Sequence, residues 1–442
     1  MRLKSLIILL FFSIAPSAQS QFKITSDKEK VTLPFQLINN LIFIQVLVND
    51  QELTFLLDTG VEQTVLFSLD DKNEIKLFDL QKLKLKGLGS NDAVESYKSS
   101  KNKIQINDFV DFDHVLYIIL DQQFNFSSHI GIPVNGIIGY NFFKNHLIEI
   151  NYERKKIIIY NHNYKQILKK IKKKFIQDSI SIEGCKPYLI SNIKSNKQIF
   201  PSKLLVDTGN SDAVWIFKSK NNKIELPQKN IQDYLGRGFS GNIYGKRARI
   251  NSFEFGRKVF EYPLVTFPDS ISIKNDNFVK NRIGSVGGEI LSRFTVIFDY
   301  LNGKIYTKPN TKINDPFHFN MSGIDVEHAG LEWVKETVEE KPNQGIKIYT
   351  NGNEQNIENS LKIRFTLKPI FKIANVRTDS EAEKSGLKVG DRILKINHEP
   401  AQGFTIQLIN ELLKSEEGKT IEIEVERNNK NYIFKFQLKN II

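Results

Sequence analysis

The chain contains the same segment twice. Asp58-Thr59-Gly60 follows one apolar run, and Asp207-Thr208-Gly209 follows another, 149 residues later (207 − 58 = 149). Four further landmarks recur in the same order at offsets of 149 or 148: Gly87-Leu88-Gly89 with Gly236-Arg237-Gly238, Ile104-Gln105-Ile106 with Phe253-Glu254-Phe255, Gly139 with Gly287, and Asn151-Tyr152 with Asp299-Tyr300. So many ordered matches do not arise by chance, and the sequence therefore predicts two copies of one unit, at roughly 22–160 and 176–310.

Each copy has the pattern of a mainly β unit. Short runs of β-branched and aromatic residues are separated by Gly, Asn-Gly and Asn-Asp turns, as in the segment 297–306. Helical patterns inside the copies are short and begin near Gly139 and Gly287, just before the last strands of each unit.

The repeated triplet carries the chemistry. An ionised carboxylate at the end of a buried strand is costly unless hydrogen bonds compensate. The Thr hydroxyl can lock the loop, and the Gly brings a backbone N–H close to the carboxylate. Approximate twofold symmetry would place Asp58 and Asp207 face to face, where they share one proton. Such a pair can activate a water for peptide hydrolysis without a covalent intermediate.

These features resemble the aspartyl proteases of the pepsin and retropepsin type. The resemblance covers about 290 of the 442 residues and includes Thr64 and the supporting elements Ile137-Ile138-Gly139 and Ser285-Val286-Gly287. It implies a duplicated, bilobal β-barrel fold in which Asp58 and Asp207 are catalytic. It also implies loop-supporting residues and glycine-rich flaps over the substrate: Thr59, Gly60, Thr64, Thr208 and Gly209 for support, and Gly87, Gly89, Gly236 and Gly238 for the flaps.

Two alternatives stand beside this interpretation. Glu62 occupies a position where the family usually has a small residue, which leaves open a catalytically inactive peptide-binding scaffold. Ser240 lies between glycines, as a serine nucleophile does, but the repeat places it in the second flap, and no suitable His and Asp partners precede it.

The C-terminal part of the sequence differs in pattern and resembles a bacterial protease-associated PDZ domain. A strand at 371–376 precedes a Ser-capped short helix that ends at Gly386, then Gly390-Asp391 and another strand. We expect an α+β domain that accepts an extended peptide as an added strand, with a groove helix at 405–415. A domain with only a structural role is the alternative. The expected groove loop contains the peptide-binding residues Leu367, Lys368, Pro369 and Ile370.

The N-terminus has the pattern of a secretory signal peptide. Arg2 and Lys4 precede the apolar segment 6–14, and Ala18-Gln19-Ser20 is a small-residue cleavage site. We expect an exported protein, periplasmic or secreted, without a transmembrane anchor; a retained N-terminal anchor helix is the alternative. The predicted units are 1–20 (signal peptide), 21–160 and 161–312 (the two lobes), and 313–442 (the PDZ domain with its linker, expected to be a tether).

Charge and composition limit the kinds of molecule that we expect the protein to bind. The formal net charge of +12 is spread thinly except in Lys165–Lys174, where a solvated linker or exposed helix face is favoured over an anionic membrane surface or nucleic acid. Cys185, expected to be buried, is the only cysteine, which excludes an intramolecular disulfide. The seven histidines lack metal-ligand spacing. We expect a monomer that acts on peptides or proteins, with no metal, cofactor or nucleic-acid partner.

Overall fold

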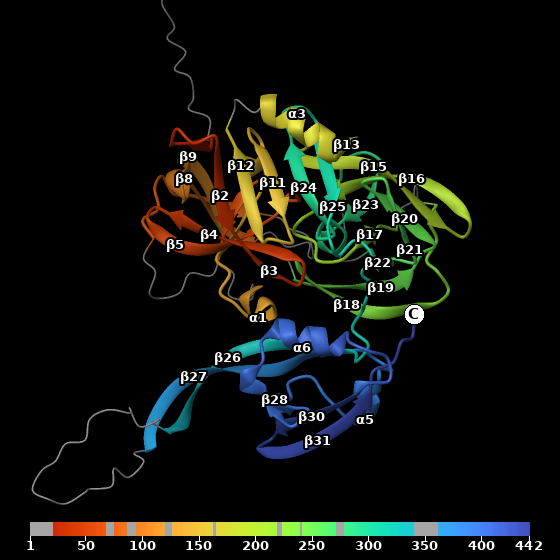
Figure 1. Ribbon diagram of the computed structural model, residues 1–442. Helices are drawn as coiled ribbons and strands as arrows, with labels where there is room; N and C mark the ends of the chain where they lie inside the picture. Colours follow the sequence, from red (N-terminus) through yellow and green to blue (C-terminus); the bar gives the residue numbers. More distant parts are fainter. Residues whose placement is uncertain are drawn as a thin grey trace, which may run out of the picture.

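The computed structural model describes residues 21–67, 75–85, 94–119, 126–161, 165–218, 223–238, 241–270, 278–339 and 361–442 (Figure 1). Two β-rich lobes lie side by side, and a smaller C-terminal domain packs beneath them in the view of Figure 1. Among the described residues, no helix combines the length and apolar character that a membrane span needs. The predicted signal peptide, residues 1–20, lies outside the described residues.

The N-terminal lobe is built on one mixed sheet, with β1 at one edge and β7 at the other. Its alternating burial pattern places the larger apolar side chains in the core. Its strands are β1 (Lys23–Ile24), β3 (Gln36–Ile38), β4 (Leu41–Val48), β5 (Gln51–Leu57), β6 (Thr64–Leu66), β7 (Gln81–Leu85), β8 (Val94–Ile106), β9 (Phe109–Ile119) and β10 (Gly136–Ile138).

The C-terminal lobe repeats this arrangement. β16 takes the place of β5, and β23 takes the place of β10, with the same parallel pairing between them. Its strands are β14 (Ser181–Glu183), β15 (Lys186–Ser195), β16 (Gln198–Val206), β17 (Val214–Ile216), β18 (Asn230–Gly238), β19 (Gly241–Arg249), β20 (Ser252–Phe255), β21 (Lys258–Glu261), β22 (Leu264–Pro268) and β23 (Arg282–Val286).

A third sheet joins the lobes. Its central strands, one from each copy, pair antiparallel, with Leu147 opposite Asp299 and Asn151 opposite Thr295. The twofold relation of the lobes therefore passes through this pair, which fixes how the two halves face each other. The sheet contains β2 (Lys30–Pro34), β11 (Leu147–Asn151), β12 (Lys156–Tyr160), β13 (Ile176–Ser179), β24 (Phe294–Asp299) and β25 (Lys304–Pro309).

Helices in the lobes are short, as the sequence predicts. α2 (Tyr140–Phe143) and α4 (Gly288–Leu291) begin directly after the two repeated glycines, and α1 (Phe126–Ile130) follows β9. The lysine run forms α3 (Lys165–Lys174), which packs Ile171 against the interlobe sheet. The exposed helix face is thus the arrangement observed for this run.

The C-terminal domain has one twisted sheet with two helices. Ser380 caps α5 (Glu381–Ser385), and Gly386 ends it in the left-handed conformation with a φ of 106°. The sheet order is β26-β27-β28-β30-β31, so β26 is an edge strand, and α6 lies against it. The other elements are β26 (Ile324–Glu339), β27 (Leu361–Val376), β28 (Arg392–Ile396), β29 (Glu399–Pro400), η1 (Ala401–Gly403), α6 (Ile406–Leu413), β30 (Thr420–Arg427) and β31 (Lys430–Gln437).

Two expectations for this domain are wrong in detail. Residues Leu367, Lys368, Pro369 and Ile370 are not a loop but part of β27, where Leu367 pairs with Trp333 and Pro369 with Leu331. The domain is also not a free tether: α6 packs near α1, and Arg249 of the C-terminal lobe donates to the Phe317 carbonyl in the connection. The long β26–β27 pairing extends the hairpin through the segment in which the sequence suggests a loop.

The predicted mainly β, bilobal fold followed by an α+β domain is confirmed. The exact domain boundaries stay predictions.

Candidate active site

The two Asp-Thr-Gly loops leave their lobes in the same way. β5 ends at Leu57 and β16 at Val206, each directly before the aspartate. The neighbouring parallel strand holds each loop, since the Asp58 N–H donates to the Ile138 carbonyl and the Asp207 N–H to the Val286 carbonyl, both at 2.9 Å. The repeated strand pair thus delivers both aspartates to the interface between the lobes.

The two threonines lock the loops to each other. The Thr59 N–H donates to Thr208 Oγ1, and the Thr208 N–H donates to Thr59 Oγ1, both at 3.0 Å. Each hydroxyl then donates across the interface, Thr59 to the Val206 carbonyl at 2.6 Å and Thr208 to the Leu57 carbonyl at 2.8 Å. Both side chains are fully buried, so these bonds face no competition from water.

The glycines bring the carboxylates together. The Gly60 N–H donates to Asp58 Oδ1 at 2.6 Å, and the Gly209 N–H donates to Asp207 Oδ1 at 3.1 Å. A Cβ on Gly60 would lie 2.9 Å from Asp207 Oδ1 and 3.0 Å from Asp58 Oδ1, and a Cβ on Gly209 would overlap the Asp58 carboxylate. Both carboxylates therefore converge on one point at the lobe interface.

The glycines that precede α2 and α4 support the two loops from behind. A Cβ on Gly139 would overlap the Val61 carbonyl, and one on Gly287 would overlap the Asp212 carbonyl. The backbone of each loop can approach its supporting element this closely only when that position is glycine.

Burial and mutual repulsion change the acidity of the pair. Burial raises the pKa of Asp58, and the negative charge of Asp207 raises it further. Burial also raises the pKa of Asp207, but the Arg282 guanidinium opposes that effect, and Lys186 lowers the pKa of both carboxyl groups. The pair therefore retains a proton above the usual carboxyl range, and the added charge of Arg282 favours ionisation at Asp207.

Arg282 is held next to the pair by aromatic rings. Its guanidinium lies 4.5 Å from the Phe278 ring centroid, 5.0 Å from that of Phe217 and 5.9 Å from that of Tyr188. Its Nε donates to the Gly284 carbonyl at 3.1 Å. The sequence does not indicate this residue as part of the site, because an arginine at the start of a strand carries no signal of which side chains surround it in the folded lobe.

Thr64 supports the first loop through partners that the sequence did not reveal. Its Oγ1 lies 2.7 Å from His114 Nε2, and His114 Nδ1 lies 2.7 Å from Asp111 Oδ2. The order hydroxyl, imidazole, carboxylate is that of a nucleophilic triad. All three residues are at most 1% exposed, however, so the hydroxyl cannot reach a substrate and the chain of bonds is structural.

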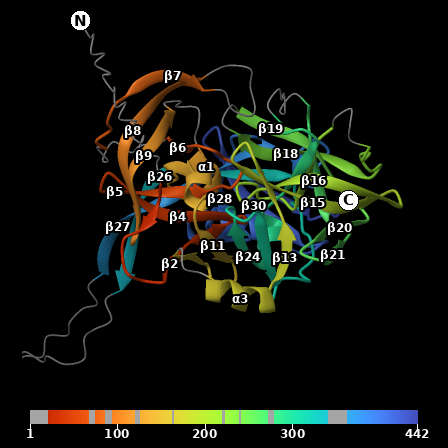
Figure 2. The same ribbon diagram turned by 90° about the horizontal axis from the view of Figure 1, so that it is seen from above.

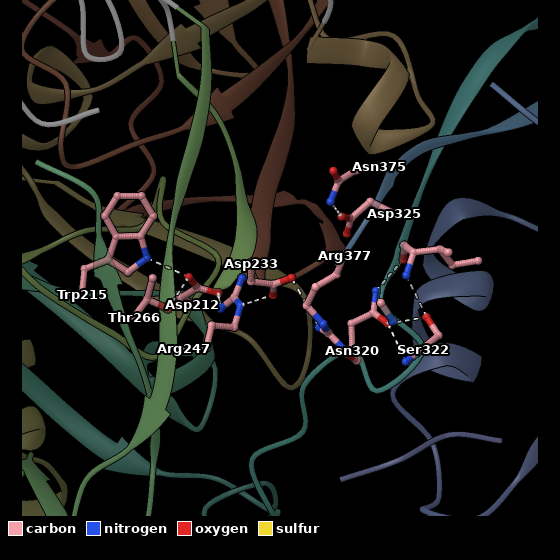
Figure 3. Close-up of polar contacts among 12 residues, drawn as sticks. Asp212, Trp215, Asp233, Arg247, Thr266, Asn320, Ser322, Asp325, Asn375 and Arg377 are labelled. Atoms are coloured by element: carbon pink, nitrogen blue, oxygen red, sulfur yellow. Dashed lines mark hydrogen bonds and ion pairs between the residues drawn. The ribbon is translucent and has the colours of Figure 1, made fainter. Parts of the chain in front are cut away.

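The second loop is supported by charged and polar side chains around Asp212 (Figure 3). Asp212, five residues after Asp207, accepts from Trp215 Nε1 at 2.7 Å, from the Thr266 hydroxyl at 3.0 Å and from Arg247 at 2.8 Å. These bonds keep the pKa of Asp212 below its usual range despite burial.

Each lobe forms a hairpin in the segment in which the resemblance implies a flap. β7 pairs with β8, and β18 with β19, and in Figure 2 both hairpins lie on the side of the molecule away from α3. Gly236 lies at an irregularity of β18 with a φ of 133°, and Gly238 ends that strand. Gly87, Gly89 and Ser240 lie outside the described residues.

Glu62 and Cys185 meet at the edge of the first loop. Glu62 is exposed, and its carboxylate accepts from Gln63 at 3.0 Å. Burial and the neighbouring Glu62 raise the pKa of the Cys185 thiol. Cys185 is only half-buried, contrary to expectation, because it sits at the tight turn between β14 and β15 with a φ of 64°.

Within the described residues, no cluster of three or more His, Cys, Asp or Glu side chains has the arrangement of a metal site.

Comparisons with known proteins bear on both parts of the chain. Residues 44–142 match a family described as aspartyl protease, and residues 345–438 match the PDZ domain family. Among solved structures, the chain is similar to conglutin gamma, a basic 7S globulin from lupine seeds, at 11% identity and a TM-score of 0.40, covering 64% of this chain and 95% of that one. No curated protein matches by sequence. The chain is thus similar to aspartyl proteases in its N-terminal lobe and to PDZ domains in its C-terminal domain.

Proposed function

We propose that the protein is an aspartic endopeptidase. The observation that carries this proposal is the convergence of Asp58 and Asp207, each bonded by the Gly N–H of its own triplet and held by reciprocal threonine bonds. A pair of carboxyl groups that holds one proton between them contains both a base and an acid.

The chemistry follows from the charges around the pair. Ionised Asp207 takes a proton from a water as the water oxygen attacks the peptide carbonyl carbon. Protonated Asp58 donates its proton to the carbonyl oxygen, which yields a tetrahedral diol. Asp207 then gives the proton that it took from water to the amide nitrogen, and one diol hydroxyl returns a proton to Asp58 as the C–N bond breaks. The products are a carboxylic acid and an amine, and the dyad is back in its starting state. Arg282 supports this assignment, since its charge favours the ionised form of Asp207.

The other parts of the proposal extend this activity. The hairpins β7–β8 and β18–β19 act as flaps over a peptide, and Thr59, Gly60, Thr64, Thr208 and Gly209 hold the catalytic loops. The PDZ domain binds peptide segments of substrates at its edge strand. We also propose that the chain is exported, on the basis of its N-terminal pattern.

Cleavage of a peptide library tests the proposal. Asp58→Asn and Asp207→Asn should each lower turnover by several orders of magnitude, because groups that act as a unit fail together. Asp299→Asn is a matched control, since Asp299 is also buried but lies at the end of β24 in the interlobe sheet, where it accepts from Asn302 in the following turn. It should cost stability and leave turnover per folded molecule unchanged. Near wild-type cleavage by either dyad variant would refute the mechanism.

The pH dependence of stability supplies an independent check on the dyad. The raised pKa of Asp58 means that the folded state retains a proton that the unfolded chain releases. Asp58 therefore contributes most to the free energy of unfolding at a pH below its pKa in the unfolded chain. This contribution is lost as the pH rises through its pKa in the folded state. Asp58→Asn should gain stability relative to wild type as the pH rises from acid to neutral, in denaturant melts. An inactive scaffold with the same geometry would show this gain without cleavage.

A further inference from the structure

The PDZ domain is connected to the β18–β19 hairpin by a buried ion pair. Arg377 follows β27 directly, and its guanidinium lies 3.4 Å from Asp233 Oδ1 on β18. The side chains are 5% and 9% exposed, so the pair is shielded from solvent on both sides. Figure 1 shows β18 on the side of the C-terminal lobe that faces the PDZ domain.

Arg377 also bonds to the turn that precedes β26, the edge strand of the PDZ sheet. The Arg377 N–H donates to the Gly323 carbonyl at 2.7 Å, and its Nη1 donates to the Asn320 carbonyl at 3.1 Å. Asn320 Oδ1 in turn accepts from the Ser322 N–H at 3.1 Å (Figure 3). Arg377 therefore belongs to a rigid turn of the PDZ domain, and it is not a mobile surface side chain.

On the lobe side, the contact continues to the catalytic loop. Asp233 Oδ2 accepts from Arg247 Nε on β19 at 2.7 Å, and Arg247 Nη1 donates to Asp212 Oδ1 at 2.8 Å. A guanidinium is a planar fork, so one side chain of fixed geometry spans the hairpin and the loop after Asp207. The four charged groups form a continuous row from the PDZ domain to the Asp207 loop (Figure 3).

The balance of charge in this row depends on Arg377. Two carboxylates, Asp212 and Asp233, face two guanidinium groups, Arg247 and Arg377. A further carboxyl group, Asp325, is close enough for the charge of Asp233 to act on it, and Asn375 donates to it at 3.0 Å. Without Arg377, Arg247 alone would have to compensate Asp233 while also holding Asp212. Loss of one partner leaves a buried charge uncompensated, which displaces the remaining groups.

We propose that Arg377 is a positioning residue through which the PDZ domain sets the hairpin β18–β19 and the loop of Asp207 in their working geometry. The effect on turnover rests on the proposed peptidase function, whereas the effect on the hairpin does not. The PDZ domain is then a structural part of the catalytic unit in addition to a peptide-binding module.

The experiment compares full-length variants at a temperature at which circular dichroism shows each to be folded. Arg377→Ala and, from the other side of the pair, Asp233→Asn remove the contact, and Arg377→Lys retains its charge. Arg427→Ala is the matched control, because Arg427 forms an ion pair with the buried Asp391 at 2.6 Å inside the PDZ domain, away from the hairpin. Turnover of a short peptide and amide hydrogen exchange at residues 230–249 are measured for each variant.

Arg377→Ala and Asp233→Asn should each lower kcat about tenfold or more, since a small displacement of a positioned group is costly, and should raise hydrogen exchange in the hairpin. Arg377→Lys should recover part of both losses. Arg427→Ala should lower the melting temperature but change neither readout. If Arg377→Ala behaves like Arg427→Ala, the inference is wrong. If the wild-type chain cleaves no peptide, the proposed function fails, while hairpin exchange still decides the role of Arg377.

Discussion

The two lobes present the same triplet but support it by different means. Around the aspartates the bonds are nearly symmetric, in partner and in distance. One layer further out, the N-terminal lobe uses the buried chain Thr64–His114–Asp111, whose three residues all belong to that lobe. The C-terminal lobe uses Asp212, Arg247 and Asp233, which lead to Arg377 of the PDZ domain. We call the bonds between the two Asp-Thr-Gly loops the inner layer, and the side chains that support these loops from further out the outer layer. The inner layer is nearly the same in both lobes, whereas the outer layer differs and, in the C-terminal lobe, extends to another domain.

The lobes also differ in charge. Arg282 lies close enough to Asp207 to oppose the rise of its pKa. Its counterpart in the N-terminal lobe, at the offset of 148 that relates Gly139 to Gly287, is the buried, apolar Val134 (282 − 148 = 134). The dyad is thus geometrically symmetric and electrostatically asymmetric, and in the proposed mechanism this asymmetry gives each aspartate its own role.

The largest effect is expected from substitutions in the inner layer. Gly209→Ala would place a methyl group on the Asp58 carboxylate, while the methyl group of Gly60→Ala would be only slightly too close to both carboxylates. We expect Gly209→Ala to lower kcat about 100-fold or more and Gly60→Ala to lower it less, because displacement of reacting groups is costly. Steady-state cleavage of one peptide by both variants measures the difference. Equal losses would show that the two loops are equivalent, and unaffected turnover would contradict the convergence of the carboxylates.

The inner layer is the part of the site that the sequence predicts well. The triplets, their glycines and the supporting Gly139 and Gly287 lie at a constant offset, and the strand pattern before each triplet places the aspartates at strand ends. Duplication turns such local patterns into a prediction of a long-range contact, because the copies must face each other for either to complete the site.

The outer layer could not be predicted in this way. His114 and Arg247 lie far from their partners Thr64 and Asp212 in the sequence. At the offset of 149, Thr64 corresponds to Ala213 and Asp212 to Gln63, so the repeat does not indicate either contact. The expected groove loop at 367–370 is wrong for a related reason. The resemblance to a PDZ domain implies a loop there, but long-range pairing with β26 continues the strand through Pro369, which an edge ribbon tolerates.

A smaller effect, on stability, is expected in the outer layer of the N-terminal lobe. Thr64→Val is nearly isosteric but removes the hydroxyl next to His114 Nε2 in a fully buried setting. We expect the free energy of unfolding to fall by about 1–3 kcal/mol, the cost of a buried polar group without its partner. Turnover per folded molecule should change far less than in Gly60→Ala. Denaturant melts and active-site-normalised kinetics measure the two quantities. A loss of turnover without a loss of stability would mean that Thr64 acts on the dyad itself.

The smallest effect is expected from the charge that distinguishes the lobes, and it appears as a shift along the pH axis. Arg282 favours the ionised form of Asp207, so Arg282→Gln should raise the pKa of that carboxyl group. The acid limb of kcat/KM against pH reports the first proton that the free dyad loses, and the limb should therefore move to higher pH. Arg282→Lys retains a positive charge between the same rings and serves as the matched variant, with a limb close to that of wild type. An acid limb that stays in place in Arg282→Gln, or that moves equally in both variants, would mean that Arg282 acts by packing against Phe217 and Phe278. The two lobes would then share the proton without the bias that assigns the base to Asp207.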